Sequence, residues 1–318
     1  MSTGIKEGTT EIARSICWRM DLKRDWEPLQ PEIHILHRGK TTISALDWKG
    51  GKPPLLMLHA SGLSAGAFAP LAERLSRFCR PIAVDLRGHG GSTPPKKMSD
   101  FSYKTLAGDV LAMLDALGIR SAHGFGQSLG GGVLLRAAIE RPCLFESLMT
   151  CEGTATPTHS APGEARARRR IEGTARIQTV WKEKQELVSH YSQKRPFDRF
   201  APEALRAFAD WGLSARDDGQ FELTCSPETQ AGYNNPSRSA IETDWIDQRI
   251  AEIPAAGTPC TVLRGRRSSI PEECHEKHVQ VLQARSVQID GGPFLPQETP
   301  ERVAEVIRRQ IGPSSESF

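Results

Sequence analysis

The sequence predicts an α/β protein in which a mostly parallel eight-stranded sheet is flanked by helices and interrupted by one long insertion. Three observations lead to this prediction. Short apolar runs alternate with segments of helical spacing over residues 31–152 and again over 248–312. A serine between two glycines separates one apolar run from the helix that follows it. A charged block over 153–247, without a clear buried strand, lies between the two alternating parts and is expected to be helical.

The first alternating part is expected to begin with a hairpin. Its strands are the runs Ile33–Leu36 and Thr42–Leu46, joined by a turn around Gly39. The continuous apolar run Leu55–Leu58 follows, and a run without polar alternation is typical of a strand buried on both faces. A helix is then expected over 65–78, because its apolar residues recur at helical spacing.

The same alternation continues toward the C-terminus. Strands that alternate with helices over short loops are joined by right-handed crossovers, so most of the sheet is expected to be parallel. The remaining elements are expected to be strands ending at 84, 126, 151, 263 and 289, and helices at 103–117, 129–140, 272–282 and 301–311.

Composition excludes several classes of protein. The 318 residues carry a formal charge of only +3, and there is no polybasic tail, so no nucleic-acid partner is expected. No apolar run approaches the roughly 20 residues that span a bilayer, so no membrane partner is expected either. The polar residues 1–30 form an N-terminal extension without the features of a secretory signal. The partner that remains is a small-molecule acyl or carbonyl substrate, and the oligomeric state stays open.

The cysteines indicate a cytoplasmic protein. There are seven, an odd number, and they are scattered without a CxxC pair, which is typical of reduced thiols. A metal site is not expected, because Cys274 and His275 project from different faces of their helix and Cys274 with His278 supplies only two ligands. No cofactor is expected.

The segment Gly126-Gln127-Ser128-Leu129-Gly130 has the pattern of a nucleophile elbow, a sharp turn between a strand and a helix. Such a turn strains the backbone and leaves no room for side chains at the flanking positions, which explains the two glycines. The helix that follows directs its N-terminal amides at the serine, and these favour a developing negative charge. Ser128 is therefore the candidate nucleophile.

With this elbow, the chain resembles the α/β-hydrolase family, from about residue 32 to 311. His59-Ala60-Ser61-Gly62 is similar to the family's oxyanion loop, so the resemblance implies that the N–H groups of Ser61 and Leu129 form the oxyanion hole. The segment 85–92 is similar to the loop after the fourth strand, where Asp85, Arg87 and His89 are expected to brace the turn.

The resemblance also exposes two departures. In the family a histidine after the last strand serves as the general base, and the aligned residue here is Pro293. Proline cannot accept a proton from Ser128. An acid normally follows the seventh strand, where this chain has Ser268 and Ser269. The catalytic triad is therefore predicted to be degenerate.

Substitutes for the missing groups are few. Glu152 follows the sixth strand, where some family members place their acid, although a structural role fits it as well. His275, at the start of the helix after the seventh strand, is a possible surrogate base. Three more histidines have weaker claims: His59 is expected to brace its loop, His123 to be buried in a strand, and His190 to lie in the insertion.

The block over 153–247 resembles the lid of a subgroup of bacterial and fungal hydrolases, some of which belong to secondary-metabolite pathways. The resemblance implies a lid over an acyl or ester pocket. Arg166 and the run 168–170 are either an attractor for an anionic substrate or a solvated helical face.

Two readings of the function remain open. The first is hydrolysis of an ester, thioester or lactone through Ser128, slowed or rewired by the degenerate triad. The second is a non-hydrolytic or catalytically silent member of the fold, which binds a small carbonyl compound or assists a cyclisation or elimination. A haloalkane dehalogenase or epoxide hydrolase is not expected, because those relatives carry aspartate where this chain has Ser128.

Overall fold

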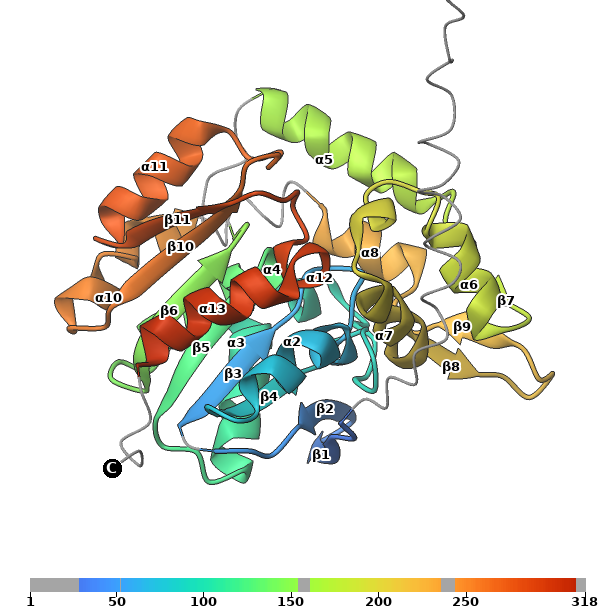
Figure 1. Cartoon of the computed structure of the whole chain (residues 1–318), viewed down its shortest axis with the longest axis horizontal. Helices are drawn as coiled ribbons and strands as arrows, with labels where there is room; N and C mark the ends of the chain where they lie inside the picture. Colours follow the sequence, from blue (N-terminus) through green and yellow to red (C-terminus); the bar gives the residue numbers. More distant parts are fainter. Residues whose placement is uncertain (1–28, 52, 154–160, 236–243, 313–318) are drawn as a thin grey trace, which may run out of the picture.

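A computed structural model describes residues 29–51, 53–153, 161–235 and 244–312. It is built around an eight-stranded sheet in the order β1-β2-β4-β3-β5-β6-β10-β11 (Figure 1). All eight predicted strands are confirmed. Their bounds are β1 (Glu32–Arg38), β2 (Thr41–Asp47), β3 (Pro54–Leu58), β4 (Arg80–Val84), β5 (Ala122–Gln127), β6 (Phe145–Cys151), β10 (Cys260–Gly265) and β11 (Arg285–Ile289).

The sheet is parallel except at one edge. β1 and β2 form the predicted antiparallel hairpin, which turns at Gly39 with a positive φ of 61°, and β2 pairs antiparallel with β4. The other neighbouring strands run parallel. The carboxyl ends of β3, β5, β6, β10 and β11 therefore meet at one edge, where ligands bind in open α/β sheets.

Helices cover both faces of the sheet. In Figure 1, α2 (Ala69–Leu75) and α13 (Pro300–Ile311) lie in front of the sheet, and α3 (Tyr103–Ala116) and α4 (Leu129–Glu140) lie behind it. α10 (Glu252–Ala255) and α11 (Glu272–Val281) add to the layer of α3 and α4. Each layer buries its own apolar cluster against the sheet.

The prediction of one continuous helix over 65–78 is wrong. The structure divides it into a 3₁₀ turn, η2 (Ala65–Phe68), and the α-helix α2. Pro70 is the physical reason, because it stands in the first turn of α2 and has no N–H to continue a ladder from the preceding turn. Two more short elements are η3 (Met98–Phe101) and α12 (Leu295–Glu298).

The insertion, defined here as residues 153–247, is not helical throughout. It contains a small sheet in the order β7-β9-β8, whose strands are too short to show a period in the sequence. Residues 244–249 are helical. The other elements are α5 (Ala161–Thr174), β7 (Val180–Trp181), α6 (Lys184–Tyr191), η4 (Phe197–Arg199), α7 (Pro202–Gly212), β8 (Leu213–Ala215), β9 (Phe221–Leu223) and α8 (Pro227–Tyr233).

The insertion shares an apolar cluster with the segment after β3. Ala60, Leu63 and Ala67 belong to one buried cluster with the insertion residues Trp181 and Phe208. α7 packs directly on η2. Figure 1 shows the elements α5 to α8 gathered at the upper right, on one side of the main sheet. The insertion is thus anchored beside the loop that follows β3.

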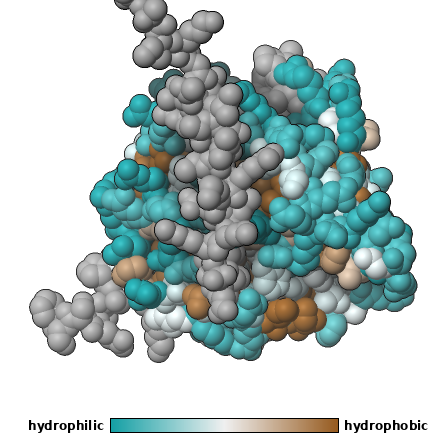
Figure 2. All heavy atoms as spheres, turned by 45° about the vertical axis from the view of Figure 1, so that its right-hand side comes forward, coloured by the Kyte–Doolittle hydropathy of each residue, from teal (hydrophilic) through white to brown (hydrophobic). Residues whose placement is uncertain are grey.

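The surface is mainly hydrophilic on the face shown in Figure 2, where apolar areas are small and separate. Ile33 and Ile35, on the edge strand β1, are exposed to 56% and 49%. Within the described ranges, no helix is both long enough and apolar enough to cross a bilayer. The six described cysteines are all unpaired, and the cytoplasmic location stays a prediction.

Candidate functional site

Ser128 occupies the turn between β5 and α4. Its backbone has φ 50° and ψ −112°, a region that residues with a side chain rarely adopt. Strain of this kind costs about 1–3 kcal/mol and persists only where the surroundings impose it. The Ser128 N–H donates to the Cys151 carbonyl at 2.9 Å. Within the described part of the chain, the Ser128 hydroxyl has no hydrogen-bond partner.

The glycines beside Ser128 are required by close backbone contacts. A Cβ on Gly126 would lie 2.6 Å from the Gly130 carbonyl oxygen, and a Cβ on Gly130 would lie 2.2 Å from the Leu58 carbonyl oxygen. Neither neighbour is a side chain that can move away. The steric reason expected for the glycine pattern is therefore confirmed for both positions.

The turn of Ser128 is joined to the loop that follows β3. Gly130 N–H donates to the His59 carbonyl at 3.1 Å, so the start of α4 and residues 59–62 are held together. Among the described residues, the N–H groups of Ser61 and Leu129 have no hydrogen-bond partner. Two unpaired backbone donors therefore lie on the two segments that meet at Ser128.

His59 braces this loop in one tautomer. Its Nδ1 lies 2.8 Å from the Ala60 carbonyl, and its Nε2 lies 3.0 Å from the Leu86 N–H. A carbonyl only accepts and a backbone N–H only donates, so the imidazole must be neutral with its proton on Nδ1. Burial lowers the pKa of His59 to about 4. Both nitrogens are engaged, so His59 has no free nitrogen for proton transfer.

His89 is held in the same way. Its Nδ1 lies 3.1 Å from the Arg87 carbonyl and its Nε2 accepts the Gly62 N–H at 3.0 Å. Burial and the neighbouring His59 lower the pKa of His89 well below its ordinary value. The two rings are in contact, with centroids 4.7 Å apart. Two neutral histidines therefore connect residues 59–62 with the loop after β4.

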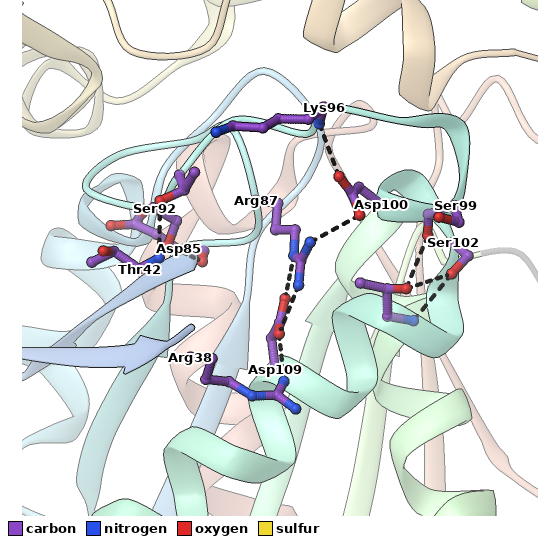
Figure 3. A network of polar contacts seen from close by, with 12 residues as sticks. Arg38, Thr42, Asp85, Arg87, Ser92, Lys96, Ser99, Asp100, Ser102 and Asp109 are labelled. Carbon is purple, nitrogen blue, oxygen red and sulfur yellow. Dashed lines mark hydrogen bonds and ion pairs between the residues drawn. The ribbon is translucent and has the colours of Figure 1, made fainter. Parts of the chain in front are cut away.

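The loop after β4 is fixed by buried charges, as expected for a structural brace. The Asp85 carboxylate accepts the N–H groups of Ala65 and Gly91 at 2.7 and 3.0 Å, and burial raises its pKa to about 6. Figure 3 shows Arg87 between Asp109, at 2.6 Å, and Asp100. These side chains support the loop, and each is already engaged by its partners.

The loop that carries Pro293 is closed by one carboxylate. Glu298 accepts the Gly292 N–H at 2.6 Å with one oxygen and the Phe294 N–H at 3.1 Å with the other. The Phe294 ring packs on Phe197 of the insertion, with centroids 6.2 Å apart. The sequence did not predict this clamp, since a contact to backbone amides leaves no pattern of residue types.

The structure brings the two candidate acid positions together. Glu152, with φ 50°, accepts the Gly265 N–H at 2.6 Å with one oxygen and a hydrogen bond from the Ser268 hydroxyl with the other. Burial raises the pKa of Glu152, and these two donors oppose that shift. The serine at one acid position thus orients the glutamate at the other, a relation that the sequence did not reveal.

His275 lines the same small cavity as Glu152. On α11, its Nε2 contacts the Ser286 hydroxyl at 2.8 Å, and burial together with Arg264 lowers its pKa. His275 lines a cavity of about 10 Å³ with Glu152, Ser268 and His278, and Ser128 is not part of the cavity wall. The structure therefore associates His275 with Glu152, and this cavity does not connect His275 to Ser128.

The other predicted histidines are also engaged elsewhere. His123 is buried on β5, as expected, and its Nδ1 contacts the Ser147 hydroxyl at 2.8 Å. His190 packs against the Trp181 ring, with centroids 4.9 Å apart. His159 lies outside the described residues. Among the described residues, no three His, Cys, Asp or Glu side chains come together as metal ligands.

The arginine run on α5 faces solvent. Arg168, Arg169 and Arg170 are exposed, which matches the solvated helical face that was one of the two expectations. The side chain of Arg166 lies outside what the structure describes.

Comparisons with known proteins agree with this geometry. A family model described as the alpha/beta hydrolase fold matches residues 53–172. The 3-oxoadipate enol-lactonase 1 of Acinetobacter baylyi is 30% identical over 291 residues, which cover 86% of this chain and 96% of that protein. The chain belongs to the α/β-hydrolase family. Its similarity to that lactonase extends through the insertion as well as the core.

Other α/β hydrolases match over different lengths. A pimeloyl-[acyl-carrier protein] methyl ester esterase of Shewanella sp. is 36% identical over 125 residues, and the alignment spans only 38% of that protein. The crystal structure of an E-2-(acetamidomethylene)succinate hydrolase superposes with a TM-score of 0.74 over 89% of this chain and 99% of the other, at 21% identity. That likeness shows the shared α/β-hydrolase fold.

Proposed function

We propose that this α/β hydrolase cleaves an ester, thioester or lactone through Ser128. The observation that carries the proposal is the strained backbone of Ser128 beside two unpaired N–H groups, on Ser61 and Leu129. Strain and unsatisfied donors are costly to the fold, and they coincide where a nucleophile and an oxyanion hole are needed.

The proposed reaction begins with attack of Ser128 Oγ on the carbonyl carbon of the substrate. Negative charge then develops on the carbonyl oxygen, which accepts hydrogen bonds from the N–H groups of Ser61 and Leu129. The N-terminus of α4 adds its dipole to this stabilisation. Removal of one such donor typically costs about 10²- to 10³-fold in rate.

Pro293 limits the proposed reaction. With no imidazole at this position, the proton of Ser128 passes to solvent, and the water that attacks the acyl-enzyme is not activated. Hydrolases without triad residues retain about 10³- to 10⁴-fold catalysis over water, from the oxyanion hole and binding. We therefore expect slow acylation and slower deacylation. In this proposal Glu152, oriented by the Ser268 hydroxyl, has no histidine to orient.

The relatives support a small acyl substrate. Their names specify an enol-lactone, a methyl ester and an acetamidomethylene succinate, and each of these compounds contains a carbonyl group. We further propose that residues 153–247 form a lid over the site of a core made of 31–152 and 248–312. The apolar cluster between the insertion and residues 60–67 supports this arrangement.

Stopped-flow kinetics with p-nitrophenyl acetate test the proposal. We expect a burst of nitrophenol equal to the enzyme concentration, followed by little turnover, with an intact mass that increases by one acetyl group. Ser128→Ala should abolish both. An acetyl group that is absent from the wild type, or retained in Ser128→Ala, would show that Ser128 is not the nucleophile.

A non-hydrolytic role is the second candidate, and Pro293 is the observation that favours it. In this role the protein binds a small carbonyl compound, or assists its cyclisation or elimination, without an acyl-enzyme. Titration calorimetry with unreactive lactone analogues would then show binding that Ser128→Ala leaves intact. The burst experiment separates the two candidates, because only the hydrolytic one produces an acylated serine.

A further inference from the structure

Two buried amides join the turn of Ser128 to the loop of Pro293. Gln127 precedes Ser128, Gln297 lies on α12, and both are completely inaccessible to solvent. Gln127 Nε2 donates to Gln297 Oε1 at 3.0 Å. Primary amides are costly to bury without hydrogen bonds, so this pair occupies the core at the expense of apolar packing.

The orientation of both amides is determined by a third group. Gln297 Nε2 donates to the Ala67 carbonyl at 3.4 Å, and a carbonyl only accepts hydrogen bonds. The side-chain oxygen of Gln297 must therefore be the acceptor toward Gln127, and the side-chain nitrogen of Gln127 must be the donor. The chain of bonds runs from η2 through α12 to the residue before Ser128. It leaves Gln127 Oε1 buried and, among the described residues, without a partner.

The main chain of Gln297 holds two further segments. Its carbonyl accepts the N–H of Ala201, in the insertion, at 2.8 Å, and its own N–H donates to the Phe294 carbonyl at 2.9 Å. Ala201 directly precedes α7, the helix that packs on η2. One buried residue thus contacts the segment before Ser128, the 3₁₀ turn η2, the loop of Pro293 and the insertion.

We propose that Gln297 is a positioning residue that fixes the turn of Ser128 and couples it to the position of the insertion. The inference deepens the proposed function and rests on Ser128 as the nucleophile. Attack by a serine requires that its oxygen be aligned with the carbonyl carbon, and a misplacement of about 1 Å can cost about 10²-fold in rate. Gln297 reaches Ser128 only through Gln127, so it acts without touching substrate.

Hydrogen exchange measures this coupling without relying on enzymatic activity. Gln297→Met keeps the approximate size of the side chain and removes both hydrogen bonds that its amide makes, to Gln127 and to Ala67. We expect faster exchange in two peptides at once, one covering 122–132 and one covering 197–208. Gln297→Asn, which keeps the amide but cannot span the same distances, should do the same if the methionine variant folds poorly.

A control is available between β10 and α13. The Thr261 hydroxyl donates to Gln310 Oε1 at 2.7 Å, a partly buried hydrogen bond between two side chains. Thr261→Val should leave the exchange of both peptides unchanged. Faster exchange in only one peptide, or equal effects from Thr261→Val, would overturn the proposal.

Acylation kinetics supply the second readout. With p-nitrophenyl acetate, Gln127→Met and Gln297→Met should each lower the saturating acylation rate by about tenfold, with an unchanged half-saturating ester concentration. The double variant should also lose about tenfold, because both changes break one connection. A loss of about a hundredfold would mean two independent effects and would contradict the proposal. If the wild type is never acylated at Ser128, the proposed function fails, and hydrogen exchange still decides the coupling.

Discussion

Glu298 accepts hydrogen bonds from the amides on both sides of position 293, so neither bond of this clamp involves the side chain at that position. Glu152 is likewise held in place by Gly265 and Ser268, whether or not a histidine is present. At the scale of single residues, the proposed departure from a complete triad is therefore local. Hydrogen bonds to neighbouring residues hold both Glu152 and the two amides that flank position 293.

Pro293→His is expected to increase steady-state ester hydrolysis. The clamp by Glu298 would present the imidazole from a loop that is already fixed, and general acid–base catalysis contributes about 10²- to 10⁴-fold. The rate of the wild type should rise continuously with pH. The rate of the variant should instead reach a plateau above the pKa of its new histidine, about 6.5. A pH–rate profile with p-nitrophenyl acetate measures both.

Two variants control this experiment. Pro293→Ala should behave like the wild type, because alanine supplies no base. Glu152→Gln should cancel most of the gain in Pro293→His and leave the wild type unchanged, if Glu152 orients the new imidazole. A gain that survives Glu152→Gln would show that this carboxylate is not the acid.

Ser128→Gly is expected to unfold at a higher urea concentration than Ser128→Ala. Alanine keeps the strain of a positive φ, whereas glycine adopts this backbone at little cost. The difference should be about 1 kcal/mol in the free energy of unfolding. An alanine variant as stable as the glycine variant would mean that the turn stores no strain.

At the scale of elements, two neutral histidines connect the loop after β3 with the loop after β4. His59 and His89 each accept a backbone N–H with Nε2, and a proton on that nitrogen would oppose the bond. The folded protein therefore holds both rings neutral. These braces make the candidate oxyanion loop sensitive to acid.

The free energy of unfolding should fall as pH decreases. The pKa of His59 is lowered from 6.5 to about 4, so its contribution is complete above pH 6.5 and is lost as pH falls toward 4. His89 acts in the same direction. Asp85 opposes them, because its pKa is raised from 3.8 to about 6 and the folded state binds its proton more tightly. His59 by itself contributes a slope of up to about 1.4 kcal/mol per pH unit between pH 6.5 and pH 4.

Urea unfolding between pH 4 and pH 8 checks this slope, with His59→Gln as the comparison. The amide oxygen of glutamine can accept the Leu86 N–H but does not titrate. The variant should show a slope that is shallower by up to about 1.4 kcal/mol per pH unit, because it lacks the proton uptake of His59 on unfolding. Equal slopes in the two proteins would show that His59 is not the titrating brace.

The guanidinium of Arg199, in the insertion, lies beside Gly292 in the loop of Pro293. A Cβ on Gly292 would lie 3.0 Å from Arg199 Nη1, and no described carboxylate pairs with this arginine. Arg199→Gln should raise KM several-fold for an ester that carries a carboxylate, and leave KM unchanged for a neutral ester. Arg169→Gln, on the exposed face of α5, is the control. Equal changes for both esters would exclude a role in anion binding.

At the scale of the whole molecule, the core and the insertion share one apolar cluster. Trp181 is almost completely buried in this cluster, together with Leu63 of the segment after β3. Separation of the two parts would expose this surface to water, at a cost of about 25 cal/mol per Å² of apolar area. We therefore expect the insertion and the core to unfold together.

Unfolding in urea should show a single transition. Far-UV circular dichroism reports on the whole chain, and the fluorescence difference between the wild type and Trp181→Phe reports on the insertion. The two curves should coincide. A fluorescence change that precedes the loss of secondary structure would identify the insertion as an independent unit.

Most of the frame was predictable from local pattern. The eight strands are apolar runs bounded by turn residues, and the turn of Ser128 has glycines where backbones approach closely. Such features depend on neighbours along the chain. The strands β7, β8 and β9 escaped prediction because two or three residues cannot show a period.

The supports of the site were not predictable in the same way. The bond between Ser268 and Glu152 spans 116 residues, and the bond between Gln127 and Gln297 spans 170. No spacing in the sequence encodes such contacts, because they arise only when the carboxyl ends of the strands come together. The sequence therefore identifies the candidate nucleophile but not the hydrogen bonds that would position it.

The clamp at Glu298 has a consequence for the history of this chain. It binds the amides of Gly292 and Phe294 without using the side chain between them. Histidine codons become proline codons by a change of the second base alone. One mutational step therefore separates the two residues, and neither hydrogen bond of the clamp involves the side chain that changes.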